Sequence, residues 1–290
     1  MKVLAFGEIL WDIFLSADGD ITERKIGGAP FNFAAHCAKN GADAFLVSAV
    51  GDDENGLDAI KEAKNLGIHT DYIKVLPETE TGACKITLKN GLPDYDLVKN
   101  VAYDHIPESE ITNIFDAVYM GTLALRSQQS KKAFDKIINQ ASTKEILFDV
   151  NFRGDFYSKE LVEELLSYTT ILKVSDEEIS FFGKENPEII CMKIAKEFPK
   201  LKYICVTLGK DGAFVFDCKK NCFYNSEKPK SKPISTVGAG DSFAAAFLTG
   251  LLSGCSPEIS LGKAVALSDF VVTQMGAVPH YDTNEIYKGI

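Results

Sequence analysis

The sequence lacks the features that would point to a membrane or a nucleic acid. Its longest weakly polar run, Phe243 to Leu252, is far shorter than the roughly 20 residues that a transmembrane helix needs. It also lacks an excess of basic charge, because 31 Lys and Arg are set against 41 Asp and Glu. This balance argues against nucleic acid or an anionic membrane as the main partner, although one nucleotide can still bind at a locally positive site.

The cysteines lack the spacing of a zinc site or of a disulfide framework. The seven are scattered, and the one close pair, Cys218 and Cys222, has neither a second pair nor histidines nearby. We therefore expect reduced, buried thiols and a cytoplasmic location. Glu8 and Asp12 interrupt the apolar N-terminal run and no small-residue cleavage site follows, so we expect a buried strand there and no signal peptide.

Two familiar phosphate-binding loops are also missing. The sequence contains no Gly-x-x-x-x-Gly-Lys-Ser/Thr, which excludes a Walker-type NTPase. The segment GAGDSF has no third glycine and follows a Lys/Pro-rich loop, so it is a poor match to a dinucleotide-binding fingerprint. A nicotinamide-dependent oxidoreductase is therefore a weak alternative.

Short aliphatic and β-branched runs alternate with helical stretches along most of the 290 residues. Strands are expected at 3–6, 44–50, 117–120, 145–150, 171–174 and 203–207, and helices at 29–40, 56–65, 128–140, 159–166 and 187–198. A further alanine-rich helix is expected after GAGD. This alternation predicts βαβ units and one α/β domain, 1–290, whose mostly parallel sheet is covered by helices on both faces.

Two segments, near 12–26 and 79–104, break this alternation. Polar and apolar residues alternate in both, and Asn90-Gly91 lies between strand-like runs, which is a strong hairpin signal. We expect the two segments to pair into a small β-layer beside the main sheet.

The stretch STVGAGDSFAAAFLTG carries the clearest chemical signal. Two glycines at the start of a helix let successive backbone N–H groups converge on an anion, and the helix dipole adds attraction. A carboxylate in the first turn, Asp241, can then accept the proton of a nucleophile aimed at a phosphoryl group. The structural alternative is a tight loop with an acidic residue at a helix N-terminus.

A second polar cluster lies near the N-terminus. Gly27-Gly28 allows a close approach of backbone to ligand, and Asn32 offers an amide early in a helix. Asp12 follows the first strand, at the strand end where open α/β sheets bind ligands. Together they suit neutral hydroxyl groups, although Asn32 can instead be a helix cap and Asp12 a turn residue.

Later strand ends carry further candidates. Asp149, Asn151 and Arg153 can orient a substrate or a phosphate, with a surface salt bridge as the alternative for Arg153. Glu178 can order magnesium and its waters, or be part of a solvated acidic helix start. The turn in VTLGKDGA suits nucleotide phosphate or ribose, or is a plain hairpin.

The ordered set of motifs resembles the ribokinase-like (PfkB) family of carbohydrate kinases, and more narrowly the bacterial fructokinases. It runs through GEILWDIF, GGAPFNFAAHCAKNGA, VGDDENG, TGACKITLKNGLPDY, VAYDHI, FDVNFR, SDEE, VTLGKDGA, TVGAGDSF and GAVP. The match covers essentially the whole chain in the order of the family.

The resemblance implies a three-layer α/β/α sandwich with a small β-lid, and transfer of the γ-phosphoryl of ATP to a sugar in the presence of Mg²⁺. The implied roles are Asp241 as base; Gly238, Ala239 and Gly240 as anion hole; Asp12, Gly28 and Asn32, with Arg153, on the substrate; Thr207, Gly209 and Gly212 on the nucleotide; and Glu178 on Mg²⁺ through water.

Two departures from the family pattern matter. Ser235 stands where the family usually has an Asp near its monovalent-cation site, which argues against potassium activation. Ser175 stands where the family commonly has the Asn of an Asn-x-x-Glu motif, although Glu178 is kept.

Fructose is the acceptor that the resemblance favours. Another ketose, a 2-keto-3-deoxy sugar acid, a nucleoside, or a non-catalytic sugar-binding role are the alternatives. In related kinases such lids can pair between subunits, so a homodimer through the lid is compatible with the resemblance.

Overall fold

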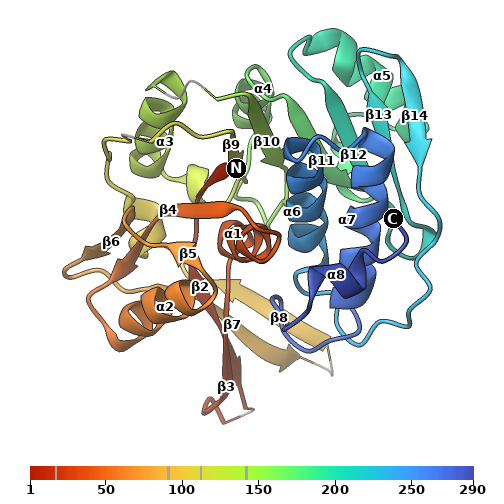
Figure 1. The fold of residues 1–290 in the computed structure, drawn as a ribbon. Helices are drawn as coiled ribbons and strands as arrows, with labels where there is room; N and C mark the ends of the chain where they lie inside the picture. The colour runs from red at the N-terminus through yellow and green to blue at the C-terminus, as the bar shows by residue number, and fades with distance from the viewer. Residues whose placement is uncertain (17, 90–91, 112, 141–142) are drawn as a thin grey trace.

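A ten-stranded sheet forms the centre of the fold in the computed structural model, which describes residues 1–16, 18–89, 92–111, 113–140 and 143–290 (Figure 1). Its strands are β1 (Lys2–Phe6), β4 (Asp43–Gly51), β5 (Ile68–His69), β6 (Ile73–Leu76), β9 (Ala117–Met120), β10 (Glu145–Asp149), β11 (Ile171–Ser175), β12 (Tyr203–Thr207), β13 (Ala213–Asp217) and β14 (Cys222–Asn225). The spatial order is β14-β13-β12-β11-β10-β9-β1-β4-β5, with β6 also paired to β4.

The strands from β12 to β5 along this order run parallel. Strand β13 runs antiparallel to both of its neighbours, β12 and β14. The carboxyl ends of the parallel strands therefore meet at one edge, where ligands bind in open α/β sheets.

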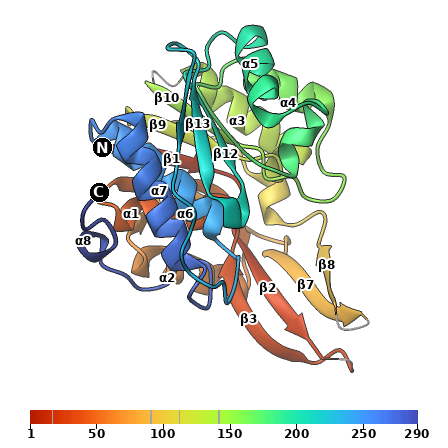
Figure 2. The same cartoon turned by 90° about the vertical axis from the view of Figure 1, so that its right-hand side faces the viewer.

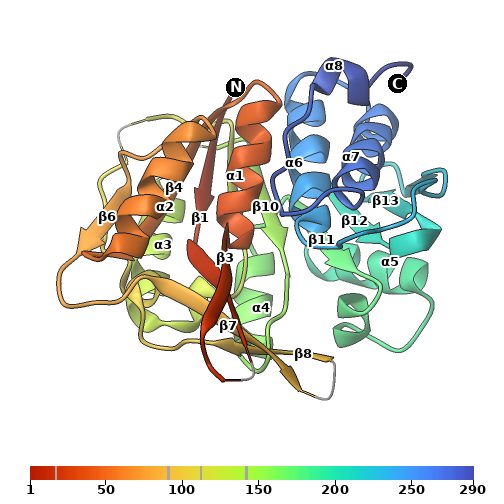
Figure 3. The same cartoon turned by 90° about the horizontal axis from the view of Figure 1, so that it is seen from below.

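Helices cover both faces of this sheet (Figures 1 and 3). One face carries α1 (Ala29–Lys39), α2 (Glu54–Asn65), α6 (Ala239–Leu252) and α7 (Pro257–Val271), with the short α8 (Thr283–Ile286) beside α7. The other face carries α3 (Gln128–Gln140), α4 (Lys159–Leu166) and α5 (Pro187–Glu197).

The strand sequences build a separate hydrophobic core on each face. Because side chains alternate along a strand, Val3 and Ala5 of β1 pack on the α1/α6 face, while Leu4 and Phe6 pack on the α3/α4 face. All four are buried, which explains why the strand reads as a continuous apolar run.

A second sheet projects from the main body (Figure 2). It consists of β2 (Leu10–Leu15), β3 (Ile21–Gly27), β7 (Gly82–Lys89) and β8 (Leu92–Leu97), in the order β3-β2-β7-β8. The two segments that break the α/β alternation therefore do pair with each other, since β2 and β7 are neighbours. The Asn90-Gly91 turn predicted between β7 and β8 lies outside the described residues.

The predicted fold class is confirmed: the chain is a three-layer α/β/α sandwich with a mostly parallel central sheet and a small second β-sheet. Strands β5, β6, β13 and β14 and helices α7 and α8 were not predicted. The four strands have only two to five residues each and lie toward the margins of the sheet. Among the described residues, no helix is both long and apolar enough to cross a membrane.

Candidate active site

Helix α6 begins without a side-chain cap. Its N-cap residue is Gly238, with a φ of 80°, and a Cβ there would overlap the carbonyl oxygen of Ala277. This position therefore requires glycine, and Thr236 does not cap the helix. With no side-chain acceptor, the N–H groups of the first turn remain suited to an anion.

Asp241, in the first turn of α6, is joined to Asn32 of α1. The Asn32 amide Nδ2 donates to Asp241 Oδ2 at 2.8 Å, so two helices distant in sequence meet at this carboxylate. Asn32 is therefore not a helix cap, and its Oδ1 is buried and has no hydrogen-bond partner among the described residues. Burial raises the pKa of Asp241, although the Asn32 hydrogen bond and the cations of Lys173 and Arg153 oppose this.

Lys173 of β11 lies against the same helix turn and was missed in the sequence. A Cβ on Gly240 would lie 2.9 Å from Lys173 Nζ, so the ammonium lies against the backbone at the start of α6. Its side chain is 8% exposed and donates to Asp149 Oδ1 at 2.8 Å. The only signal in the sequence was a charged residue inside an otherwise apolar strand.

Asp149 at the end of β10 anchors this lysine. Its carboxylate is fully buried and also accepts from the Tyr119 hydroxyl at 3.3 Å. Burial raises the pKa of Asp149 to about 6, against the lowering effect of Lys173. Burial lowers the pKa of Lys173, but the nearby carboxylates, Asp149 first, more than offset it and leave that pKa raised. At neutral pH the two side chains form a buried ion pair.

The acceptor side of the site is built from β2 and the start of α1. Asp12 lies in β2, not in a turn, and its Oδ2 would be 3.3 Å from a Cβ on Gly27. Burial raises the pKa of Asp12 to about 6, with Arg153 and Lys25 opposing. Gly28 is the N-cap of α1 with a φ of 108°.

Glu8 supports this glycine turn and was also missed. A Cβ on Gly28 would lie 2.5 Å from the Glu8 carbonyl oxygen, so the turn and Glu8 are packed together. The Glu8 carboxyl is 3% exposed and accepts from the Ala29 amide at 3.3 Å. Burial raises the pKa of Glu8 to about 7.

Arg153 follows β10 and is exposed. Its guanidinium lowers the pKa values of Glu8, Asp12 and Asp241, which places one cation in electrostatic range of all three carboxyls. Among the described residues it forms no ion pair within 4.0 Å, so the surface salt bridge considered for it is not seen.

Glu178 ties the loop after β10 to the end of β11. Its Oε1 accepts from the Phe152 amide at 3.0 Å and its Oε2 from the Ser175 amide at 2.8 Å. The carboxylate still has free lone pairs, and Mg²⁺ commonly uses one carboxylate, several waters and substrate phosphates. This donor set fits a magnesium ion held through water.

A cavity of about 260 Å³ opens beside the first turn of α6. It is lined by five of the predicted residues, namely Thr207, Gly209, Gly212, Ala239 and Gly240. The hairpin of β12 and β13 forms one wall, so the hairpin and ligand-site interpretations of VTLGKDGA describe the same segment. Pro229, Ser231 and Pro233, from the Lys/Pro-rich loop that precedes α6, form another wall.

This arrangement places a helix N-terminus with no side-chain cap, a buried ammonium and several carboxyls at the carboxyl edge of the sheet, where α/β proteins bind small molecules. Residues 2–284 match the model of the pfkB family carbohydrate kinases, and the chain belongs to this family of sugar kinases.

Two curated relatives cover nearly the whole chain. An ATP-dependent 6-phosphofructokinase from Thermoanaerobacterium thermosaccharolyticum is 25% identical over 97% of this chain and 92% of its own length. A 2-dehydro-3-deoxygluconokinase from Thermoproteus tenax is 26% identical over 95% of this chain and 90% of its own.

Two solved structures share the fold. An E. coli protein described as a candidate ribokinase II, in complex with ATP and Mg²⁺, has a TM-score of 0.85 at 24% identity and covers 98% of this chain and 97% of its own. A fructokinase from Vibrio cholerae O395, with fructose, ADP and calcium bound, has a TM-score of 0.82 at 20% identity. The match covers 99% of this chain and 98% of the fructokinase.

Proposed function

We propose that the protein transfers the γ-phosphoryl group of ATP to a hydroxymethyl group of a free sugar, and that fructose is the first acceptor to test. The observation that carries this proposal is the Asn32–Asp241 hydrogen bond at the N-terminus of α6. It leaves Asn32 Oδ1 as a buried acceptor without a donor, which a sugar hydroxyl would supply.

Asp241 acts as the general base in this proposal. Its Oδ2 is held by Asn32, and its Oδ1 accepts the proton of the sugar hydroxyl. The alkoxide oxygen forms a bond to the γ-phosphorus while the bond to the β,γ-bridging oxygen breaks, and ADP leaves with that electron pair. A raised pKa makes Asp241 a stronger base once it is ionised.

The transferred group is held by fixed positive charge and dipoles. In this proposal the group binds the amides of Gly238 and Gly240 and that of Ala239, which without a ligand donates to the Thr236 carbonyl at 3.3 Å. The Lys173 ammonium lies directly beside Gly240. Such preorganised donors stabilise charge that develops in the transition state. Magnesium, bound to ATP and ordered through water by Glu178, would neutralise phosphate charge.

The second sheet serves as a lid in this proposal, within a single domain spanning 1–290. It carries Asp12 on β2, so closure over the sugar would complete the acceptor site and exclude water, which is itself a phosphoryl acceptor. A homodimer through this sheet remains part of the proposal.

The charges near the lid favour a neutral acceptor. A sugar acid or a phosphorylated sugar would need a cationic anchor, and Arg24 and Lys25 are the lid residues suited to it. Arg24 is already bonded to Asp58 and Asn55, and Lys25 to Glu23. Arg153 has no ion pair among the described residues and lowers the pKa of Asp12, so it is the cation best suited to anchor a charged acceptor.

The test is ADP release from ATP and Mg²⁺ across a panel of sugars, with fructose, ribose, 2-keto-3-deoxygluconate, fructose 6-phosphate and a nucleoside. We expect sugar-dependent release, highest with a neutral ketose, and little ATP hydrolysis without sugar. Sugar binding without ADP release would instead establish the non-catalytic alternative. Release that is highest with a phosphorylated or acidic sugar would overturn the choice of fructose.

A further inference from the structure

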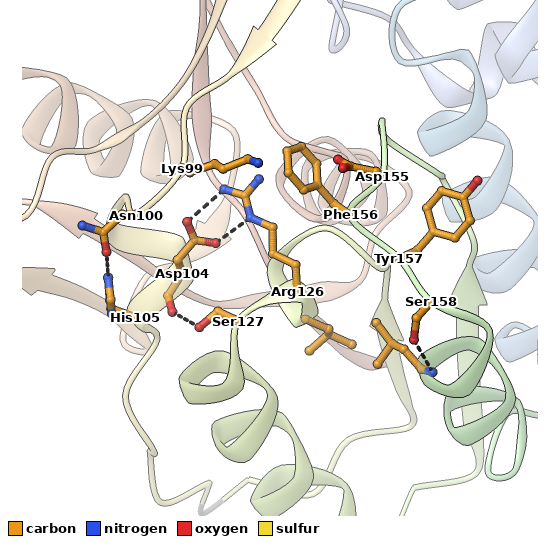
Figure 4. A pocket seen from close by; sticks show the side chains of 12 residues that line it. Lys99, Asn100, Asp104, His105, Arg126, Ser127, Asp155, Phe156, Tyr157 and Ser158 are labelled. Atoms are coloured by element: carbon orange, nitrogen blue, oxygen red, sulfur yellow. Dashed lines mark hydrogen bonds and ion pairs between the residues drawn. The ribbon is translucent and has the colours of Figure 1, made fainter.

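A second pocket, of about 670 Å³, lies at the carboxyl edge of the main sheet and is lined by none of the residues assigned above (Figure 4). Its lining comes from segments that follow β8, β9 and β10, next to α3 and α4, whereas Asp241 and Asn32 belong to helices on the other face. It is lined by Lys99, Asn100, Asp104, His105, Leu125, Arg126, Ser127, Asp155, Phe156, Tyr157, Ser158 and Leu161.

Arg126 is the most constrained cation of this pocket. Its Nε and Nη2 donate to the two carboxylate oxygens of Asp104 at 2.8 and 2.9 Å, and Nη2 also reaches the Val98 carbonyl. The side chain is only 10% exposed, and Nη1 is buried without a hydrogen-bond partner among the described residues. In Figure 4 the guanidinium points toward Lys99 and Phe156. A buried guanidinium donor left unpaired is costly and calls for an acceptor.

A second cation, Lys99, and the N-terminus of a helix lie near this guanidinium donor. The ammonium of Lys99 is exposed and lies 4.9 Å from the centre of the Phe156 ring; no carboxylate is within 4.0 Å of it in the part of the chain that is described. Helix α4 begins at the pocket wall, with Ser158 as its cap. Helix N-termini favour anions. The one lining carboxylate without an ion pair among the described residues is Asp155, which is exposed.

We infer that this pocket binds a small phosphate monoester, such as a sugar phosphate. The Phe156 ring covers the Arg126 guanidinium, with its centre 4.4 Å from Cζ. Once this ring moves aside, the phosphate oxygens accept from Arg126 Nη1 and from Lys99. The organic part lies against Phe156 and Tyr157, which form part of the apolar wall together with Leu125 and Leu161. Because Asp104 already neutralises most of the Arg126 charge, the extra positive charge that attracts the ligand comes from Lys99.

The pocket is connected to the kinase site by one loop. Phe156 and Tyr157 follow Arg153 closely, and Tyr157 stacks on Phe152 with ring centres 3.7 Å apart. The Phe152 amide in turn donates to Glu178. A ligand that contacts these rings therefore orders the segment that carries Arg153, and its binding is expected to change when the acceptor site is filled.

The test is a calorimetric titration of the full chain with glycerol 3-phosphate and, separately, inorganic phosphate. Excess Mg²⁺ and a non-hydrolysable ATP analogue are present to fill the anion hole at α6. The variant is Lys99→Glu, an exposed position where the fold should tolerate the change. Lys132→Glu, an exposed lysine of α3 outside the pocket lining, is the matched control.

We expect one glycerol 3-phosphate per chain, with affinity reduced at least about tenfold in Lys99→Glu and unchanged in Lys132→Glu. Hydrogen exchange of 155–161 should slow when the ligand binds. Absence of saturable binding, equal binding by Lys99→Glu, or protection confined to 236–242 would each overturn the proposal. The titration needs no acceptor sugar, so its failure is distinct from failure of the kinase assay.

Discussion

The two ends of the candidate site differ in how firmly the fold holds them. At the phosphoryl end, Gly238 packs on the backbone of Ala277, and Lys173 is buried against Asp149 inside the main sheet. At the acceptor end, Asp12 is half-buried on the second sheet and Arg153 is exposed. Strand β3, at the edge of that sheet, is mostly exposed.

This difference suggests that the phosphoryl end stabilises the transition state and the acceptor end selects the sugar. Groups that stabilise a transition state act best when they are already fixed, since no reorganisation is then needed. Groups that select the acceptor can lie on surface elements that tolerate change.

The largest effect is expected at Asp241, at the phosphoryl end of the site. We expect Asp241→Asn to lower kcat by about 10²–10⁴-fold, because a general base contributes about that much. Affinity for the sugar should stay nearly unchanged, since Asn keeps the shape and can still bond to Asn32. Initial rates and sugar titration by calorimetry measure the two quantities; undiminished kcat would refute the role of base.

The second effect concerns Lys173, the buried cation of the phosphoryl end. We expect Lys173→Met to lower kcat about 10²-fold, similar to the loss of one donor to a developing oxyanion. The ammonium also lowers the pKa of Asp241. Since the base must be ionised, losing that ammonium should move the acid limb of the pH–rate profile to higher pH.

Lys173→Met leaves Asp149 buried without its partner, which can destabilise the fold. The double variant Lys173→Met/Asp149→Asn removes the orphaned charge and should recover stability without recovering kcat. Lys202→Met, a partly buried lysine paired with Glu145, is the matched control and should leave the profile in place. An acid limb that does not move in either Lys173 variant would contradict the direct action on Asp241.

The sequence was sufficient for elements whose pattern is local. Helix α4 and strand β9 were predicted at their observed bounds, since each has a clear period and clear ends. The pairing of the two inserted segments followed from their strand-like alternation. The roles assigned to Asp241, Asn32 and the glycines remain predictions, although the structure brings several of these residues together.

The groups that were missed depend on contacts between distant segments. Lys173 is significant because β11 places it under the start of α6, more than 60 positions later in the sequence. In the sequence, Glu8 only interrupts an apolar run. Its contact with Gly28 depends on how α1 packs beside β1 in the fold. Such three-dimensional neighbours carry no periodic signal.

The smallest effect is expected at the acceptor end, where a substitution should change KM rather than kcat. Asp12→Asn should raise the KM for the sugar roughly tenfold, the range expected for one hydrogen bond to a charged group. Its kcat should change by no more than about threefold, because the interaction is made equally in ground and transition states. Asp20→Asn, at an exposed position in the β2–β3 connection, is the control.

The pH dependence of KM distinguishes this role from a structural one. The pKa of Asp12 is raised to about 6, so the carboxylate becomes protonated as the pH falls through 6 and its hydrogen bond to a hydroxyl weakens. KM should therefore rise below pH 6 in the wild type, and this rise should be absent in Asp12→Asn. If Asp12→Asn instead lowers kcat as strongly as Asp241→Asn does, at unchanged KM, the two ends do not divide the work in this way.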